Sequence, residues 1–197
     1  MGNGTGKGTQ QTLSQKVVLW TKGRLGRKVG RGQCWDLAEE ALKHAGAKTS
    51  NDLGPVGEDT DYIWGDQIKR IGDVRRGDIL QIRDHLVKTT TVVVYKFADG
   101  SYITETKERT AKRGHHTAIV RSTPDVNGTV KTYEQHVNGR DVVQKLTLHT
   151  RSIPAKTSKS VGRYKHPRTK KVEQVSITTT VTVDVSGTIW PYRPKPK

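Results

Sequence analysis

The chain has 197 residues and carries 35 Lys and Arg against 19 Asp and Glu, which gives a formal net charge of +16. This length suits one domain with a core of its own, and the single cysteine excludes an intrachain disulfide framework. No apolar run is long enough to cross a membrane, and the first twelve residues lack the apolar stretch of a signal peptide. We therefore expect a disordered leader at residues 1–12, one domain over 13–193 and a basic tail over 194–197, in a protein that is cytoplasmic unless it is exported by another route.

Two helices are expected in the first quarter of the chain. Apolar residues recur at helical spacing from Leu13 and predict a helix over about 13–25. A second helix is expected to begin near Gln33, after a glycine-rich basic turn, and Gly46 is placed to end it. A loop rich in glycine and proline is predicted at 51–61.

From residue 77 onward the pattern changes to the period of two that is typical of strands. The segments with this pattern cover 77–82, 89–97, 102–106, 117–120, 129–137, 142–148, 172–185 and 188–192. Residues 154–169 are basic and are expected to be irregular. Helices followed by strands predict an α+β fold, in which N-terminal helices pack on an antiparallel sheet or half-barrel of about six strands.

The only cysteine, Cys34, falls at the start of the second predicted helix. The first turn of a helix offers free backbone N–H groups and the positive end of the helix dipole. Both favour a thiolate over a thiol, so a cysteine at this position tends to have a lowered pKa. Cys34 is therefore a candidate nucleophile, which needs a base and a group that orients the base.

Two neighbouring strands offer these groups. His115 and His116 begin the strand at 117–120, and they point to opposite sides because side chains alternate along a strand. The turn at Asn127-Gly128 makes the next strand its antiparallel partner, so Glu134 can lie beside His116.

His136 is predicted to share the face of Glu134, and His115 is expected to be exposed. Adjacent histidines with no cysteine ligand do not predict a metal site. The proposed chemistry also requires no organic cofactor.

Four motifs occur in the order of a known fold: Gly32-Gln33-Cys34, Gly77-Asp78-Ile79-Leu80, His116-Thr117-Ala118-Ile119-Val120 and Glu134-Gln135. Over about residues 15–194, the chain resembles the CHAP and NlpC-type branch of the papain-like cysteine peptidase fold. It resembles one subgroup more closely, the cysteine-proteinase-fold domain of fungal myosin-tail-interacting proteins and related uncharacterised bacterial chains.

The resemblance implies a role for each matching residue. Cys34 matches the nucleophile, His116 the base, Glu134 the orienting residue and Gln33 the glutamine that precedes the nucleophile in the CHAP pattern. By analogy, the backbone N–H of Cys34 would contribute to an oxyanion hole. Many CHAP members have asparagine where this chain has His136, so Glu134, His136 or both are candidates for orienting His116.

The leading hypothesis is a thiol-dependent amide hydrolase, a peptidase or amidase that acts on peptides. The resemblance points to cell-wall peptides as a substrate class, and the basic surface also suits an anionic polymer. The first alternative is a papain-like binding or scaffold module with weak or no hydrolysis. The hairpin at 89–106 is an insertion that would form a wall of the cleft or a partner surface. The second alternative is a basic nucleic-acid-binding protein.

Overall fold

The computed structural model describes residues 11–57 and 59–197, so most of the predicted leader lies outside the described residues. Three helices come first, α1 (Leu13–Lys22), α2 (Cys34–Ala45) and α3 (Ser50–Leu53), and a 3-10 turn, η1 (Ile71–Asp73), follows. The described strands are β1 (Asp66–Gln67), β2 (Ile79–Lys96), β3 (Tyr102–Val120), β4 (Thr129–Glu134), β5 (Gln144–His149), β6 (Ile153–Lys165) and β7 (Val172–Arg193). None of these helices is long and apolar enough to span a membrane.

The strands form one antiparallel sheet in the order β1-β7-β2-β3-β4-β5, and β6 pairs with β7. The α+β prediction agrees with this arrangement, in which the sheet has about seven strands rather than six. Several predicted strands are joined in pairs: 77–82 with 89–97 in β2, 102–106 with 117–120 in β3, and 172–185 with 188–192 in β7. The sheet and its few helices are compatible with a papain-like fold.

The expectation of an irregular segment at 154–169 is wrong, because residues 153–165 form β6. Nearly every side chain of β6 is exposed, so the strand shows no apolar alternation that would identify it. The backbone pairing with β7 holds it in place, with consecutive partners from Lys156 to Lys165.

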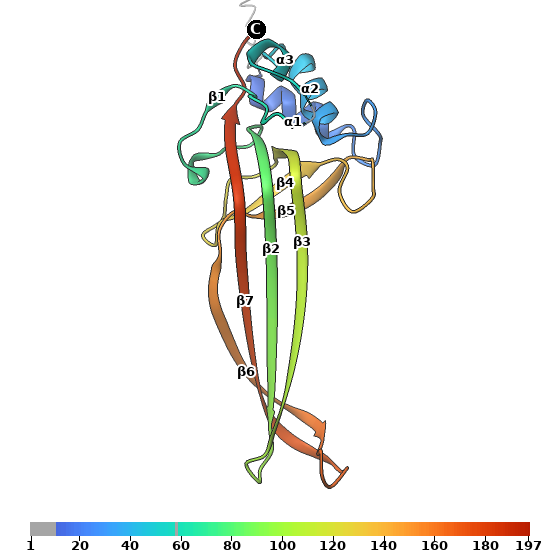
Figure 1. Ribbon diagram of the computed structural model, residues 1–197, viewed down its shortest axis with the longest axis vertical. Coiled ribbons are helices and arrows are strands. Elements are labelled where there is room, and N and C mark those ends of the chain that lie inside the picture. The colour runs from blue at the N-terminus through green and yellow to red at the C-terminus, as the bar shows by residue number, and fades with distance from the viewer. Residues whose placement is uncertain (1–10, 58) are drawn as a thin grey trace, which may run out of the picture.

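The long strands carry the sheet far beyond the helices (Figure 1). Residues 86–112 of β2 and β3, with residues 153–185 of β6 and β7, are here called the arm. At its tip, the ring of His166 packs edge-on against Phe97 at 4.6 Å, and Arg168 pairs with Asp99 at 2.6 Å. The two hairpins of the arm are therefore joined at their ends.

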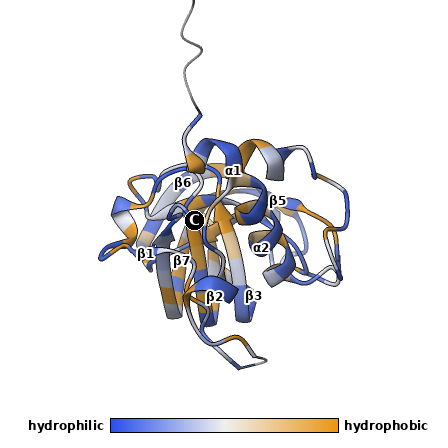
Figure 2. Ribbon diagram, turned by 90° about the horizontal axis from the view of Figure 1, so that it is seen from above, coloured by the Kyte–Doolittle hydropathy of each residue, from blue (hydrophilic) through white to orange (hydrophobic). Residues whose placement is uncertain are grey.

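The core lies at the other end of the molecule, on both faces of the sheet. Seen from above, α1 and α2 lie to one side of the row formed by β7, β2 and β3 (Figure 2). The cluster beneath these helices includes Val17, Val18, Leu37, Leu42, Ile79, Ile119 and Tyr133. A second cluster on the opposite face includes Leu80, Ile82, Ala118, Val120, Val130 and Leu148. Both clusters use β2 and β3, so these two strands are fixed from either side where the candidate site is built.

Asp78 ties the start of β2 to the end of the chain. Its buried carboxylate accepts hydrogen bonds from Arg193 Nη2 at 3.0 Å and from the backbone N–H of Arg75 at 2.6 Å. Beyond β7, the Lys195 side chain pairs with Asp66 at 3.1 Å, and the backbone carbonyl of Lys195 accepts a hydrogen bond from the Lys48 N–H. The predicted basic tail is thus packed against the domain.

We expect Gly77→Ala to lower the free energy of unfolding by about 3 kcal/mol, because a side chain there meets two obstacles. The backbone has a φ of 91°, and a Cβ atom would collide with the backbone of Ser14 in α1. Gly100 is the matched control, since its φ is 84° but its surroundings are open, and Gly100→Ala should cost about 1 kcal/mol. Urea unfolding measures both values. Equal losses would mean that the contact with Ser14 adds nothing.

Candidate active site

The loop before α2 places Cys34 at the first residue of the helix, as the sequence predicts. Gly30 and Gly32 have φ values of 55° and 99°, which let the chain turn tightly into the helix. The Asp36 carboxylate accepts hydrogen bonds from the backbone N–H groups of Arg31 at 2.7 Å and Gln33 at 3.2 Å. Asp36 therefore fixes the turn that presents the thiol.

Gln135 clamps the same loop from the other side of the site. Its side-chain amide accepts a hydrogen bond from the Val29 N–H and donates to the carbonyls of Val29 and Gln33, each at 2.9 Å. Gln135 directly follows Glu134 at the end of β4, so one short segment holds both the loop and the carboxylate. The Glu134-Gln135 motif signalled this region, although the sequence did not show what Gln135 would bind.

Cys34, His116 and Glu134 lie together in a hydrogen-bonded series. His116 Nε2 lies 3.1 Å from Glu134 Oε2, and both side chains are almost fully buried. The imidazole is also hydrogen-bonded to the Cys34 thiol, and since Glu134 occupies Nε2, the ring has Nδ1 left for the sulfur. The geometry thus brings together three residues that come from α2, β3 and β4.

The electrostatics of this series favour charge separation. Burial opposes ionisation of Cys34, but the hydrogen bond and positive charge of His116 outweigh it, helped by the backbone N–H groups of Thr117 and Trp35, so the thiol pKa is lowered. Burial acts to lower the pKa of His116, but its hydrogen bonds to Cys34 and Glu134 raise it to about 9. Both shifts favour a thiolate beside an imidazolium over the neutral pair.

Glu134 is held in its charged form by two cationic neighbours. Burial alone would raise its pKa, but His116 and Arg113 lower it to about 2. Arg113 donates from Nε to Glu134 Oε2 at 2.7 Å and from Nη2 to Oε1 at 3.2 Å. The side chain of Arg113 is only 7% exposed, so this is a buried ion pair. Arg113 is not among the site residues that the sequence predicts.

His136 is placed differently from the sequence prediction. β4 ends at Glu134, and His136 follows in a turn with a φ of 62°, so the two residues do not share a strand face. The ring of His136 is half exposed and its Nδ1 lies 2.7 Å from Asp141 Oδ1. Of the two predicted orienting residues, the described contacts place Glu134 against His116.

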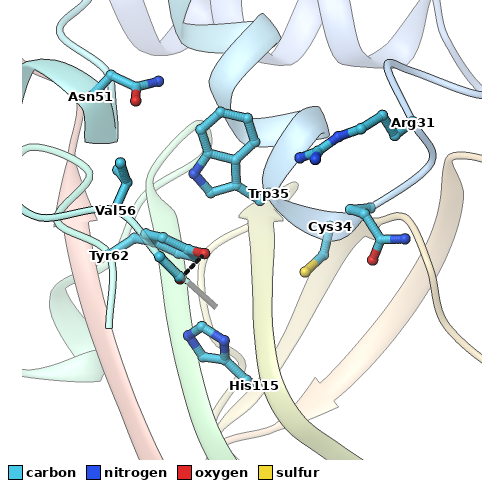
Figure 3. A pocket seen from close by; sticks show the side chains of 9 residues that line it. Arg31, Cys34, Trp35, Asn51, Val56, Tyr62 and His115 are labelled. Atoms are coloured by element: carbon cyan, nitrogen blue, oxygen red, sulfur yellow. Dashed lines mark hydrogen bonds between the residues drawn. The ribbon is translucent and has the colours of Figure 1, made fainter. Parts of the chain in front are cut away.

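A cleft of about 650 Å³ opens at the thiol. Figure 3 shows the sulfur of Cys34 and the ring of His115 facing the space bounded by Trp35, Tyr62 and Val56. His115 was expected to be exposed, but its ring packs on Tyr62 at 5.3 Å between centroids and its side chain is 22% exposed. The remaining lining residues are Arg31, Gln33, Asn51 and Gly57.

A buried carboxylate fixes one wall of this cleft. Trp35 Nε1 donates to the Ser50 hydroxyl at 2.9 Å, and Ser50 donates to Glu39 at 3.1 Å. Asn51 also donates to Glu39, at 2.6 Å. Through these contacts Glu39 holds α3 against α2 and sets the positions of Trp35 and Asn51 at the cleft.

A second, smaller cleft of about 200 Å³ lies on the His116 side. It is lined by Lys112, Arg113, Gly114, His115, His116, His136, Val137 and Asn138. His115 lines both clefts, whereas Cys34 lines the larger one and His116 the smaller one. Among the described residues, no group of three or more His, Cys, Asp and Glu side chains is arranged to hold a metal ion.

Comparisons with known proteins agree with the expected fold family. The chain is 35% identical over 89 residues to Altered inheritance of mitochondria protein 3 from Debaryomyces hansenii, a match that covers 40% of this chain and 10% of that protein. No solved structure matches the chain. Residues 7–196 match the family described as the AIM3/BBC1 Cysteine proteinase-fold domain. Since this match covers almost the whole sequence, the chain belongs to the AIM3/BBC1 cysteine-proteinase-fold domain family.

Proposed function

We propose that this protein is a thiol-dependent amide hydrolase that uses Cys34 as nucleophile, His116 as acid and base, and Glu134 as the residue that positions His116. The observation that carries the proposal is the buried series from thiol to imidazole to carboxylate, which opens into a cleft at the sulfur. Strongly shifted pKa values in a cleft are typical of catalytic groups. The CHAP and NlpC-type assignment belongs to the same proposal.

The reaction begins with the thiolate of Cys34, which attacks the carbonyl carbon of the substrate amide. The C–N bond breaks as the His116 imidazolium gives its proton to the leaving amine, and a thioester to Cys34 remains. His116 then takes a proton from water, the hydroxide attacks the thioester, and the acid product leaves as the thiolate and imidazolium re-form. Glu134 stays ionised throughout and stabilises the imidazolium.

The negative oxygen that forms during attack needs hydrogen-bond donors. The N–H of Cys34 is one of the first N–H groups of α2, which have no acceptor within the helix. Gln33 lines the cleft beside Cys34, and its side-chain amide supplies a second donor in this proposal. The role of the Cys34 N–H follows the sequence prediction, and Gln33 is the residue that matches the glutamine of the CHAP pattern.

The two clefts give the substrate a direction. The leaving amine must sit on the side of His116, which protonates it, so the smaller cleft with Lys112 and His136 receives the leaving group. The acyl part then enters the larger cleft between Trp35 and Tyr62. We therefore propose peptides with a bulky apolar or aromatic residue on the acyl side, and cell-wall peptides are one candidate group within this class.

Peptides with a fluorogenic leaving group and varied acyl residues test this function. The protein should cleave the aromatic members, and Cys34→Ala should abolish the cleavage. Tyr62→Ala should raise KM by about tenfold through loss of an aromatic wall, whereas Tyr102→Ala, on the exposed edge of the arm, should change neither kcat nor KM. Turnover that survives Cys34→Ala, or no turnover with any peptide, would contradict the proposal.

The arm favours a second candidate function, a binding module built on the same domain. The arm occupies much of the chain but contains none of Cys34, His116 and Glu134. It is linked to the site through β3, which continues from the arm to His116. A module of this kind would keep its partner affinity in Cys34→Ala, which separates binding from hydrolysis.

A further inference from the structure

The outer edge of the arm, formed by β6 and the turn after it, is rich in positive charge and contains no acidic residue. Residues 153–171 contain seven Lys and Arg and no Asp or Glu. One of them, Arg168, pairs with Asp99 at the tip, and no ion pair joins Lys156, Lys159, Arg163, Lys165 or Lys171 to another described residue. This excess of charge lies on β6 and on the turn that follows it.

β6 pairs with β7 along one side, and the described strands leave its other side without a partner. The pairing runs without interruption from Lys156 to Lys165, so ten consecutive residues form a regular edge. A regular edge presents backbone N–H and C=O groups to an incoming strand.

The two faces of β6 differ. Tyr164 turns toward the interior of the arm, where its ring stacks on Tyr95 at 4.1 Å and its hydroxyl donates to Glu105 of β3. Alternation then places Lys159, Val161, Arg163 and Lys165 together on the opposite face. Val161 is 66% exposed, and beside it lies a hollow of about 520 Å³ lined by Val161, Gly162, Arg163 and Gln174. The outward face thus offers three cations around one apolar contact.

We propose that β6 is a docking edge for an extended acidic peptide segment, which adds to the sheet as a further strand. Acidic side chains at alternate positions of that segment would face Lys159, Arg163 and Lys165, and an apolar side chain would cover Val161. The same charges disfavour a second copy of β6, because an antiparallel pair of such edges sets cation against cation. This inference does not depend on the proposed hydrolysis.

A nucleic acid is the less suitable occupant of this edge. Single-stranded binding uses aromatic faces on which bases stack, and the aromatic ring of β6 is turned inward on Tyr95. A nucleic acid would also leave the backbone groups of a regular strand edge unused, whereas a peptide strand pairs with them.

Fluorescence anisotropy with the full chain and four labelled probes tests the proposal. The probes are a peptide of about ten residues that carries three Glu and one Val on the face opposite Lys159, Val161, Arg163 and Lys165, its Gln counterpart, its alternately N-methylated form and an oligothymidylate. The acidic peptide should bind. The Gln peptide should bind at least about tenfold more weakly because it lacks the charges, and the N-methylated peptide likewise because it lacks half of the backbone donors.

Charge reversals locate the site. Lys159→Glu combined with Arg163→Glu should weaken binding of the acidic peptide by about tenfold or more, because two attractive cross-strand pairs become repulsive. Lys170→Glu combined with Lys171→Glu makes the same change of net charge in the turn after β6, and it should weaken binding of the peptide by less than about threefold. Both pairs are exposed, and circular dichroism checks that each variant is folded.

Four results would overturn the proposal: no binding of the acidic peptide, equal losses in the two double variants, unchanged binding after N-methylation, or tighter binding of the oligothymidylate. The last result, with an affinity that falls steeply as salt rises, would identify a nucleic-acid surface instead. Each outcome is independent of the peptide-cleavage assay, so failure of one proposal does not imply failure of the other.

Discussion

Replacing Glu134 with Ala should lower the free energy of unfolding by about 3–5 kcal/mol, which is the usual cost of breaking a buried ion pair. The change leaves Arg113 with a buried charge and no carboxylate, since both side chains are shielded from solvent. It also removes the group that holds His116 Nε2. Urea unfolding followed by circular dichroism measures the loss.

Acid should weaken the native protein through the same carboxylate. The pKa of Glu134 is lowered from 4.5 to about 2, so its stabilising contribution is complete above the unfolded value and is lost as the pH falls from about 4.5 toward 2. Glu134→Gln keeps the shape of the side chain but cannot ionise, and the unfolding free energy of this variant should depend less on pH across that interval.

A compensated variant separates stability from chemistry. Replacing Arg113 with Met and Glu134 with Leu removes both charges together, and this double variant should recover most of the stability lost in Glu134→Ala. It should not recover a reactive Cys34, because the imidazolium of His116 still lacks its carboxylate. A double variant as unstable as Glu134→Ala would show that the pair matters for reasons other than its buried charge.

The elements around the thiol follow from local signals in the sequence. Glycines before Cys34 and at Gly46 set the bounds of α2, and both are short-range effects that a sequence records directly. The neighbouring positions of His116 and Glu134 also follow from one turn, at Asn127-Gly128, between two alternating strands.

Arg113 was missed because its position depends on an irregular strand. Simple alternation puts a residue three positions from His116 on the opposite face. The ladder between β2 and β3 carries no pair at Asp84, which has a φ of 51°, and beyond this point Arg113 is buried against Glu134. The predicted strand continues through His136, whereas β4 ends at Glu134 and the chain turns at His136. The polar residues around this turn give no local signal that the strand ends there.

The arm was divided into short strands because its residues have no deep core to mark them. Thr and Lys dominate its outer positions, so apolar alternation fades where the backbone pairing continues. The arm is held together by backbone pairing between distant segments and by contacts at its tip, such as Phe97 with His166. Such contacts leave no local pattern in the sequence, so the arm can be recognised only from the three-dimensional structure.

Cys34 should react with a neutral electrophile such as iodoacetamide near neutral pH, and His116→Ala should slow this reaction by about tenfold or more. Burial alone would raise the thiol pKa, and His116 reverses that effect through its hydrogen bond and charge. Without the imidazole, burial dominates and the pKa rises, so less thiolate is present at neutral pH. Rates measured between about pH 5 and 10 give the pKa in each variant. Equal midpoints in the two proteins would contradict the thiolate–imidazolium pair.

The pH dependence of hydrolysis should have two limbs that belong to the same pair. Activity should rise as Cys34 loses its proton, at a pH below the ordinary thiol value of 9.0, and fall as His116 deprotonates near about 9. Glu134→Gln should move the falling limb to lower pH, because a neutral amide supports the imidazolium less than a carboxylate does. Asp141→Asn is the matched control, since Asp141 contacts His136 rather than His116 and should leave both limbs in place. If the falling limb moved with Asp141 and not with Glu134, then His136 would be the residue that governs the site.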